Sequence, residues 1–80
     1  MFYVYILRSQ IYKEQIYVGF TSHLAKRLEE HNDGKCDYTE KYRPWKIAMY
    51  LAFDDKTKAV QCERYFKTAS GKSLITRRFL

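Results

Sequence analysis

Residues Tyr17 to His31, with the sequence Y-V-G-F-T-S-H-L-A-K-R-L-E-E-H, decide the fold of this chain. The stretch begins as a short strand, turns at Gly19 and enters a helix near Ser22. Arg27 and His31 are four residues apart on that helix, and residues at this spacing lie on the same helical face. We therefore expect the side chains of Arg27 and His31 to project together.

Three segments are rich in β-branched and aromatic residues, which is typical of strands. They are Phe2 to Leu7, Gln15 to Gly19 and Trp45 to Phe53, and the polar segment Arg8 to Glu14 closes a hairpin between the first two. Period-two alternation places Phe2, Val4 and Ile6 on one face of the first strand and Tyr3, Tyr5 and Leu7 on the other. Both faces are apolar, so we expect this strand to be central in its sheet.

The first helix is predicted to have Thr21 or Ser22 as its N-cap and Gly34 at its end, with Leu24 and Leu28 as its buried stripe. The following polar segment, Lys35 to Pro44, has room for one short helical turn.

A second long helix is predicted over Lys56 to Ser70, ended by Gly71. Its core stripe is Ala59, Cys62, Phe66 and Ala69. The tail Lys72 to Leu80 is predicted to form a short amphipathic helix with Leu74, Ile75 and Phe79 packed against the core. These elements predict a single α+β domain over residues 1–80, in which a small three-stranded antiparallel sheet is flanked by helices.

The composition excludes several classes of protein. There is no apolar run of about 18 residues and no signal-peptide pattern, so we expect a cytoplasmic protein with no membrane association. Cys36 and Cys62 are too few for a disulfide scaffold, and with His23 and His31 they have unusual spacings for a zinc site. We expect both thiols to be reduced, with Cys62 in the core.

The net charge of +6 is concentrated in the second half of the chain. Residues 1–40 carry five Lys or Arg against six Asp or Glu, whereas residues 41–80 carry ten against three. Such an asymmetry favours a polyanionic partner, of which nucleic acid is the first candidate. A basic surface without a specific partner is the alternative.

Tyr5 and Tyr17 are predicted to share one face of the sheet. A phenol is a poor base at pH 7 unless a cation acts on it, so two core tyrosines with satisfied hydroxyls are the alternative. Arg27 is suited to clamp a phosphate and His31 to relay a proton. The alternative for this pair is a solvated helix edge.

Glu63 lies beside the apolar stripe of the second long helix, where a solvated glutamate is less expected. One protein carboxylate, completed by waters and phosphate oxygens, is a normal Mg²⁺ site. The alternative is an ion pair between Glu63 and Lys67 at i+4.

The ordered set of residues resembles the GIY-YIG nucleases. The two motifs that name the family would be Tyr3-Val4-Tyr5 and Tyr17-Val18-Gly19. They are followed at the family's spacing by Arg27, His31 and the helical Glu63. The opening Y-V-Y-I-L, the E-H-N end of the first helix, the R-P-W entry to the third strand and the A-x-x-x-E of the next helix are similar to the small stand-alone bacterial branch (UPF0213-like proteins).

The resemblance implies a nuclease with one divalent cation, Mg²⁺ or Mn²⁺, at a concave basic face. Tyr17 would act as general base, Tyr5 would position water or phosphate, and Glu63 would bind the metal, which would stabilise the leaving oxygen. Arg27 would stabilise the phosphate, and His31 matches the family histidine.

Two residues depart from the family pattern. Tyr3 replaces the Gly of the first motif, and Phe20 stands where some members carry a Lys close to the second-motif Tyr.

Nucleic acid, DNA rather than RNA, is the expected partner, with a homodimer or an accessory protein as further candidates. A non-catalytic or partner-dependent nucleic-acid-binding module is the alternative function. Its predicted contacts are Lys26, Arg64, Lys67, Lys72, Arg77 and Arg78.

Overall fold

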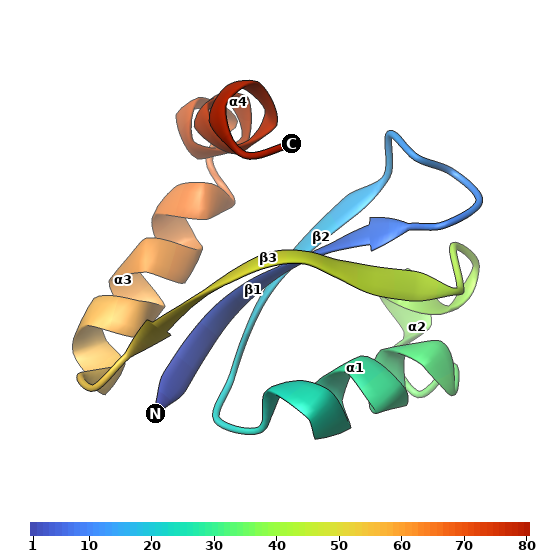
Figure 1. Ribbon diagram of the computed structural model, residues 1–80, viewed down its shortest axis with the longest axis horizontal. Helices are drawn as coiled ribbons and strands as arrows, with labels where there is room; N and C mark the ends of the chain where they lie inside the picture. The colour runs from blue at the N-terminus through green and yellow to red at the C-terminus, as the bar shows by residue number, and fades with distance from the viewer.

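The computed structural model describes residues 1–80 as one three-stranded sheet with four helices. In chain order the elements are β1 (Phe2–Ser9), β2 (Ile16–Thr21), α1 (Leu24–Asn32), α2 (Asp37–Glu40), β3 (Trp45–Phe53), α3 (Lys56–Phe66) and α4 (Ala69–Arg78). The sheet is twisted, and α1 and α3 lie on opposite sides of it (Figure 1). This arrangement confirms the predicted α+β class.

The strands are antiparallel in the order β2-β1-β3, so β1 is central as predicted. In the β1–β2 register, Leu7 is opposite Tyr17 and Tyr5 is opposite Gly19. The β1–β3 register shifts between Ile6 and Leu7, at a bulge in the ladder. β2 and β3 are therefore the edge strands of the sheet.

One face of the sheet carries the larger apolar cluster. Its buried members come from β1, β2, α3 and α4 and are Val4, Ile6, Val18, Ala59, Phe66 and Ile75. Cys62 is half-buried against this cluster and its thiol is free, as expected. Burial of these side chains under α3 and α4 supplies the hydrophobic driving force on this side.

The other face carries a smaller cluster under α1, formed by Tyr5, Leu7 and Trp45. Leu24 and Leu28 of α1 pack against it, as the helical stripe predicted. The end of α1 is held to β3 because the Asn32 side-chain oxygen accepts a hydrogen bond from the Trp45 N–H (2.6 Å) and its amide donates one to the Trp45 carbonyl (3.0 Å). The E-H-N end of α1 and the start of β3 are therefore joined through Asn32.

The start of α1 differs from the prediction. The helix begins at Leu24 after His23, and neither Thr21 nor Ser22 is its N-cap. The Thr21 hydroxyl instead accepts a hydrogen bond from the His23 N–H at 3.0 Å, which orders the turn before the helix. At the other end, Gly34 follows the helix as predicted.

The predicted helix from Lys56 to Ser70 is two helices. Lys67 ends α3, and Thr68 caps α4 by accepting a hydrogen bond from the Gly71 N–H at 3.0 Å. Gly71 is therefore a residue of the first turn of α4 rather than a helix stop. A Cβ at this position would overlap the backbone of Tyr65 and Phe66, so glycine permits the close approach of α4 to the end of α3.

The packing of the C-terminal segment is partly as predicted. Ile75 is fully buried and Leu74 is half-buried, but Ala69 and Phe79 are exposed, against the prediction. The apolar cluster is covered here by Leu80, which packs against it in place of Phe79. The structure contains no helix with the length and apolar character needed to span a bilayer.

Candidate active site

The Tyr5 ring lies directly over the backbone of Gly19, its cross-strand partner on β2. A Cβ at position 19 would overlap the ring and hydroxyl of Tyr5. The glycine of the second motif is therefore required by the tyrosine of the first motif. This contact brings the two short motifs, which are 14 residues apart by position, onto one surface of the sheet.

A buried chain of hydrogen bonds starts at the Tyr5 hydroxyl. Its oxygen is 2.9 Å from His31 Nε2, and His31 Nδ1 is 2.8 Å from the Thr39 hydroxyl. With the Thr39 hydroxyl donating its one proton to the Cys36 carbonyl (3.3 Å), Nδ1 is assigned as the donor toward Thr39. It follows that Nε2 is the acceptor and that the Tyr5 hydroxyl donates to it.

Burial sets the protonation of this chain. Desolvation raises the pKa of Tyr5 to about 12, although the nearby Arg27 guanidinium opposes the shift. Desolvation together with the Arg27 charge lowers the pKa of His31 to about 4. Both groups are therefore neutral near pH 7. Tyr5 keeps its proton for His31 and presents its free lone pairs as acceptors.

His31 was predicted to project together with Arg27, and the alternative was a solvated helix edge. The solvated alternative is wrong for His31, whose side chain is fully buried. Arg27 is half-buried, and its guanidinium donates to the Glu30 carboxylate at 2.9 Å. That hydrogen bond raises the pKa of Arg27 and lowers that of Glu30, so both remain charged.

Tyr17 lies half-buried beside this chain of hydrogen bonds. Its ring centroid is 4.9 Å from that of His31 and 6.4 Å from that of Tyr5. On its other sides are the Lys67 ammonium, 5.8 Å from the ring centroid, and the Tyr38 ring at 5.8 Å. The structure thus brings together Tyr5, Tyr17 and His31, with Arg27 at their border.

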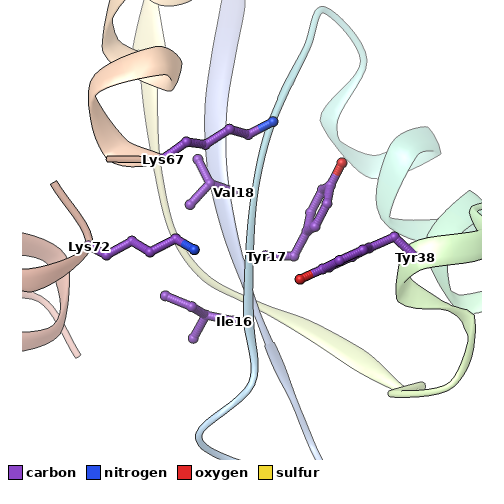
Figure 2. A pocket seen from close by; sticks show the side chains of 6 residues that line it. All are labelled: Ile16, Tyr17, Val18, Tyr38, Lys67 and Lys72. Atoms are coloured by element: carbon purple, nitrogen blue, oxygen red, sulfur yellow. The ribbon is translucent and has the colours of Figure 1, made fainter. Parts of the chain in front are cut away.

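A hollow of about 370 Å³ opens over the edge strand β2. It is lined by Ile16, Tyr17, Val18, Tyr38, Lys67 and Lys72. Figure 2 shows the two lysines reaching toward β2 from the end of α3 and from α4, with Tyr17 and Tyr38 on the other side of the strand. The hollow thus combines two aromatic rings with two positive charges, which suits a phosphate next to a planar base.

Glu63 lies on α3, on the opposite side of the sheet from Tyr5. Its carboxylate pairs with Lys67 Nζ at 3.1 Å, which is the ion pair considered as the alternative to a metal site. Because the same ammonium lies over the Tyr17 ring, Lys67 connects Glu63 to the hollow. No group of three or more His, Cys, Asp or Glu side chains is placed to hold a metal ion, so a cation here would have Glu63 as its one carboxylate.

The predicted nucleic-acid contacts lie in three places. Lys67 and Lys72 line the hollow over β2. Lys26 lines two hollows at the start of α1, one with Arg27 and one with Tyr3. Arg64, Arg77 and Arg78 are exposed on α3 and on the last turn of α4 and line no hollow.

Sequence reasoning missed Tyr38, which lines the hollow although it is distant along the chain from both motifs. Its side chain is 63% exposed, even though the ring of Tyr17 is nearby. The signal was a large aromatic residue within the polar segment Lys35 to Pro44.

Comparisons with known proteins identify the family of this chain. Residues 1–77 match the profile of the GIY-YIG catalytic domain. A UPF0213 protein of Bacillus licheniformis is 39% identical over 72 residues, which cover 89% of this chain and 72% of that protein. The UPF0213 protein YsiG of Lactococcus lactis is 40% identical over 67 residues, covering 82% of this chain and 62% of its own.

The solution structure of a UPF0213 protein from Bacillus halodurans matches with a TM-score of 0.58 and 28% sequence identity. The match covers 99% of this chain and 87% of that one. This chain spans less than two thirds of the length of several of its relatives. From the match over residues 1–77, the chain belongs to the GIY-YIG catalytic domain family, and proteins similar to it are bacterial UPF0213 proteins.

Proposed function

We propose that this protein is a divalent-metal-dependent nuclease that hydrolyses phosphodiester bonds of nucleic acid, with DNA as the favoured substrate. One observation carries the proposal. Tyr17 stands between a buried hydrogen-bonded pair, Tyr5 and His31, and an open hollow with two lysines. A phosphate bound in that hollow would lie next to Tyr17, whose ring packs against the hydrogen-bonded Tyr5 and His31 side chains.

In this proposal the step is an in-line attack of water on the phosphorus, and the bond from phosphorus to the leaving oxygen breaks. Tyr17 is the general base for the attacking water, and the positive charge of Lys67 over its ring stabilises the phenolate. Lys67 thus supplies the charge that some family members place at position 20, where this chain has Phe20.

Tyr5 and Arg27 position the reacting groups. The Tyr5 proton is directed to His31, so its oxygen accepts a hydrogen bond from the attacking water. The Arg27 guanidinium stabilises the negative charge that develops on the phosphate, because it stays protonated and retains donors besides the one bound to Glu30.

The donor set fits a divalent cation of the one-carboxylate type. Glu63 is the carboxylate paired with Lys67, which lines the hollow, and its side chain is 20% exposed. Mg²⁺ keeps several waters and is commonly bound by one or two carboxylates with substrate phosphates, so Glu63 would suffice. When bound, the cation would stabilise negative charge on the leaving oxygen. The Glu63–Lys67 ion pair would open so that the Glu63 carboxylate could bind the cation.

The second candidate function is a non-catalytic nucleic-acid-binding module. The observation that favours it is the Glu63–Lys67 ion pair, in which the proposed metal ligand already has a partner. The two functions differ in whether Glu63 is needed for cleavage or only for the arrangement of Lys67.

The test is cleavage of single-stranded, duplex, flapped and branched DNA and RNA in Mg²⁺ or Mn²⁺. We expect Glu63→Gln to lower the cleavage rate at least about a hundredfold, because metal stabilisation contributes several kcal/mol to the transition state. Binding in the absence of metal should stay largely intact. Glu29→Gln, an exposed position on α1, is the matched control and should leave the rate unchanged. Cleavage by Glu63→Gln at the wild-type rate would contradict the metal assignment. If the wild type and both variants bind nucleic acid but none of them cleaves it, the result would favour the non-catalytic module.

A further inference from the structure

A second basic hollow lies at the hairpin end of the sheet, apart from the hollow over β2. It has a volume of about 240 Å³ and is lined by Arg8, Ser9, Gln10, Lys13 and Lys46. No apolar and no acidic residue lines it, and three of the five residues are cations. None of these cations belongs to either ion pair of the molecule.

Arg8 lines this hollow and also contains a buried group without a partner. Its Nε atom is the only side-chain nitrogen or oxygen in the chain that is buried without a hydrogen-bond partner. A buried donor without a partner is costly, and in native proteins such a group calls for a water, an ion or a ligand. The surrounding charges select among these, because three unpaired cations favour an anion.

The walls of this hollow are fixed by hydrogen bonds rather than formed by loose surface chains. The buried Ser9 hydroxyl donates to the Tyr42 carbonyl at 2.7 Å and accepts from the Ile11 and Tyr12 N–H groups. The Gln10 N–H donates to the Pro44 carbonyl at 2.9 Å. The hairpin that carries Lys13 is therefore tied to the start of β3, where Lys46 lies.

The sheet register connects the two hollows. Arg8 is opposite Ile16 on β2 and opposite Lys46 on β3. Directly opposite residues of antiparallel strands project to the same face and lie about 5 Å apart. Since Ile16 also lines the hollow over β2 with Lys67 and Lys72, the cations of the two hollows are neighbours across the Arg8–Ile16 pair.

We propose that Arg8, Lys13 and Lys46 form a second phosphate-binding site, which holds the nucleic-acid backbone a short distance from the phosphate at Tyr17. This inference rests on the proposed function for the identity of the ligand. The bidentate geometry of a guanidinium suits a phosphate, and Arg8, which lines the hollow, belongs to neither ion pair of the protein. The site would hold the strand in register by its backbone and would be insensitive to base sequence.

The first test is NMR of the arginine Nε–Hε groups in ¹⁵N-labelled protein without divalent metal, so that nothing is cleaved. A short single-stranded DNA oligonucleotide and, separately, inorganic phosphate are the probes. We expect the Arg8 signal to shift saturably with the oligonucleotide, while the signal of Arg43, which is exposed before β3, stays in place. An Arg8 signal that does not respond to the oligonucleotide would overturn the proposal. A response to inorganic phosphate alone would replace it with a small-anion site.

The second test needs no change at the half-buried Arg8. Lys46→Gln should weaken oligonucleotide binding about fivefold at low salt and lower the salt slope by roughly 0.7 for a single strand. Lys58→Gln removes the same charge from an exposed position in the first turn of α3, which follows the Phe53 end of β3, and should change neither quantity. Equal effects of the two substitutions would overturn the proposal in favour of net charge alone.

These results are separable from the outcome for the proposed function. A protein that binds the oligonucleotide through Arg8 and Lys46 but cleaves nothing would contradict the nuclease and leave the second phosphate site in place. Cleavage with an unresponsive Arg8 would leave the nuclease and remove the site.

Discussion

The two faces of the sheet bury different kinds of groups. The face under α3 and α4 is sealed by six apolar side chains, whereas the face under α1 combines Tyr5, Leu7 and Trp45 with the buried polar side chains of His31 and Thr39. Apolar burial stabilises without geometric demands, but a buried polar chain is tolerable only when every partner is in place. The difference indicates that one face carries stability and the other holds phenols in defined positions.

The largest effect that would sharpen this comparison is expected on the apolar face. Phe66→Ala should lower the free energy of unfolding by about 4 kcal/mol, since it removes a large buried side chain and leaves a cavity. Urea denaturation measures the change. Tyr65→Ala, at the exposed neighbouring position, is the control and should cost less than about 1 kcal/mol. Equal losses at the two positions would contradict a division of the sheet into a stabilising and a functional face.

The second prediction separates the two phenols on the α1 face. Tyr17→Phe should lower the cleavage rate about a thousandfold because it removes the proposed general base. Its hydroxyl makes no hydrogen bond within the protein, so stability should change little. Tyr5→Phe should also cost roughly 1–3 kcal/mol of stability, because the hydrogen bond to His31 is lost in a buried place. Cleavage rates and urea-denaturation midpoints of both variants measure the two effects separately. A Tyr17→Phe protein with wild-type cleavage would assign the base to another group.

The strands and their faces were predictable because alternation in β1 is a local property. The pairing of Tyr5 with Gly19 follows from the hairpin, and the shared face of Tyr5 and Tyr17 could be stated in advance. The division of the predicted second helix could not, since Gly71 is used for a contact between helices. That contact exists only after α3 and α4 have packed. From the sequence alone, a glycine at this position indicates the end of a helix.

The candidate site shows the same limit. The residues near Tyr17 along the chain, Arg27 and His31, were placed by helical spacing, but the burial of His31 depends on Thr39 from α2. Tyr38 and the bridging position of Lys67 depend on how α2 and α3 approach the edge of β2. Contacts across elements of this kind are set by tertiary packing, and no periodicity in the sequence records them.

The third prediction concerns the pH dependence of the polar face. The pKa of His31 is lowered from 6.5 to about 4, so the unfolded chain takes up a proton before the folded one as the pH falls. The stability that depends on neutral His31 is complete above about pH 6.5 and is lost toward pH 4, by up to roughly 3 kcal/mol.

Urea denaturation between pH 7 and pH 4 provides the measurement. His31→Gln should lose less stability than the wild type over this interval, although its stability at pH 7 is lower. His23→Gln, at an exposed position, should retain the wild-type pH dependence. Identical slopes for His31→Gln and the wild type would show that His31 is not buried as a neutral group.

The smallest effect is expected where the two faces meet, at the hollow over β2. Tyr38→Leu should weaken binding of single-stranded DNA by about tenfold, because base stacking on an aromatic ring contributes roughly 1–3 kcal/mol. Its effect on duplex DNA should be smaller, since paired bases are not free to stack. Tyr65→Leu, also an exposed tyrosine but outside the hollow, is the matched control. If both substitutions weaken binding equally, the hollow has no preference for an unpaired base, and its lysines alone account for the attraction of nucleic acid to this edge of the sheet.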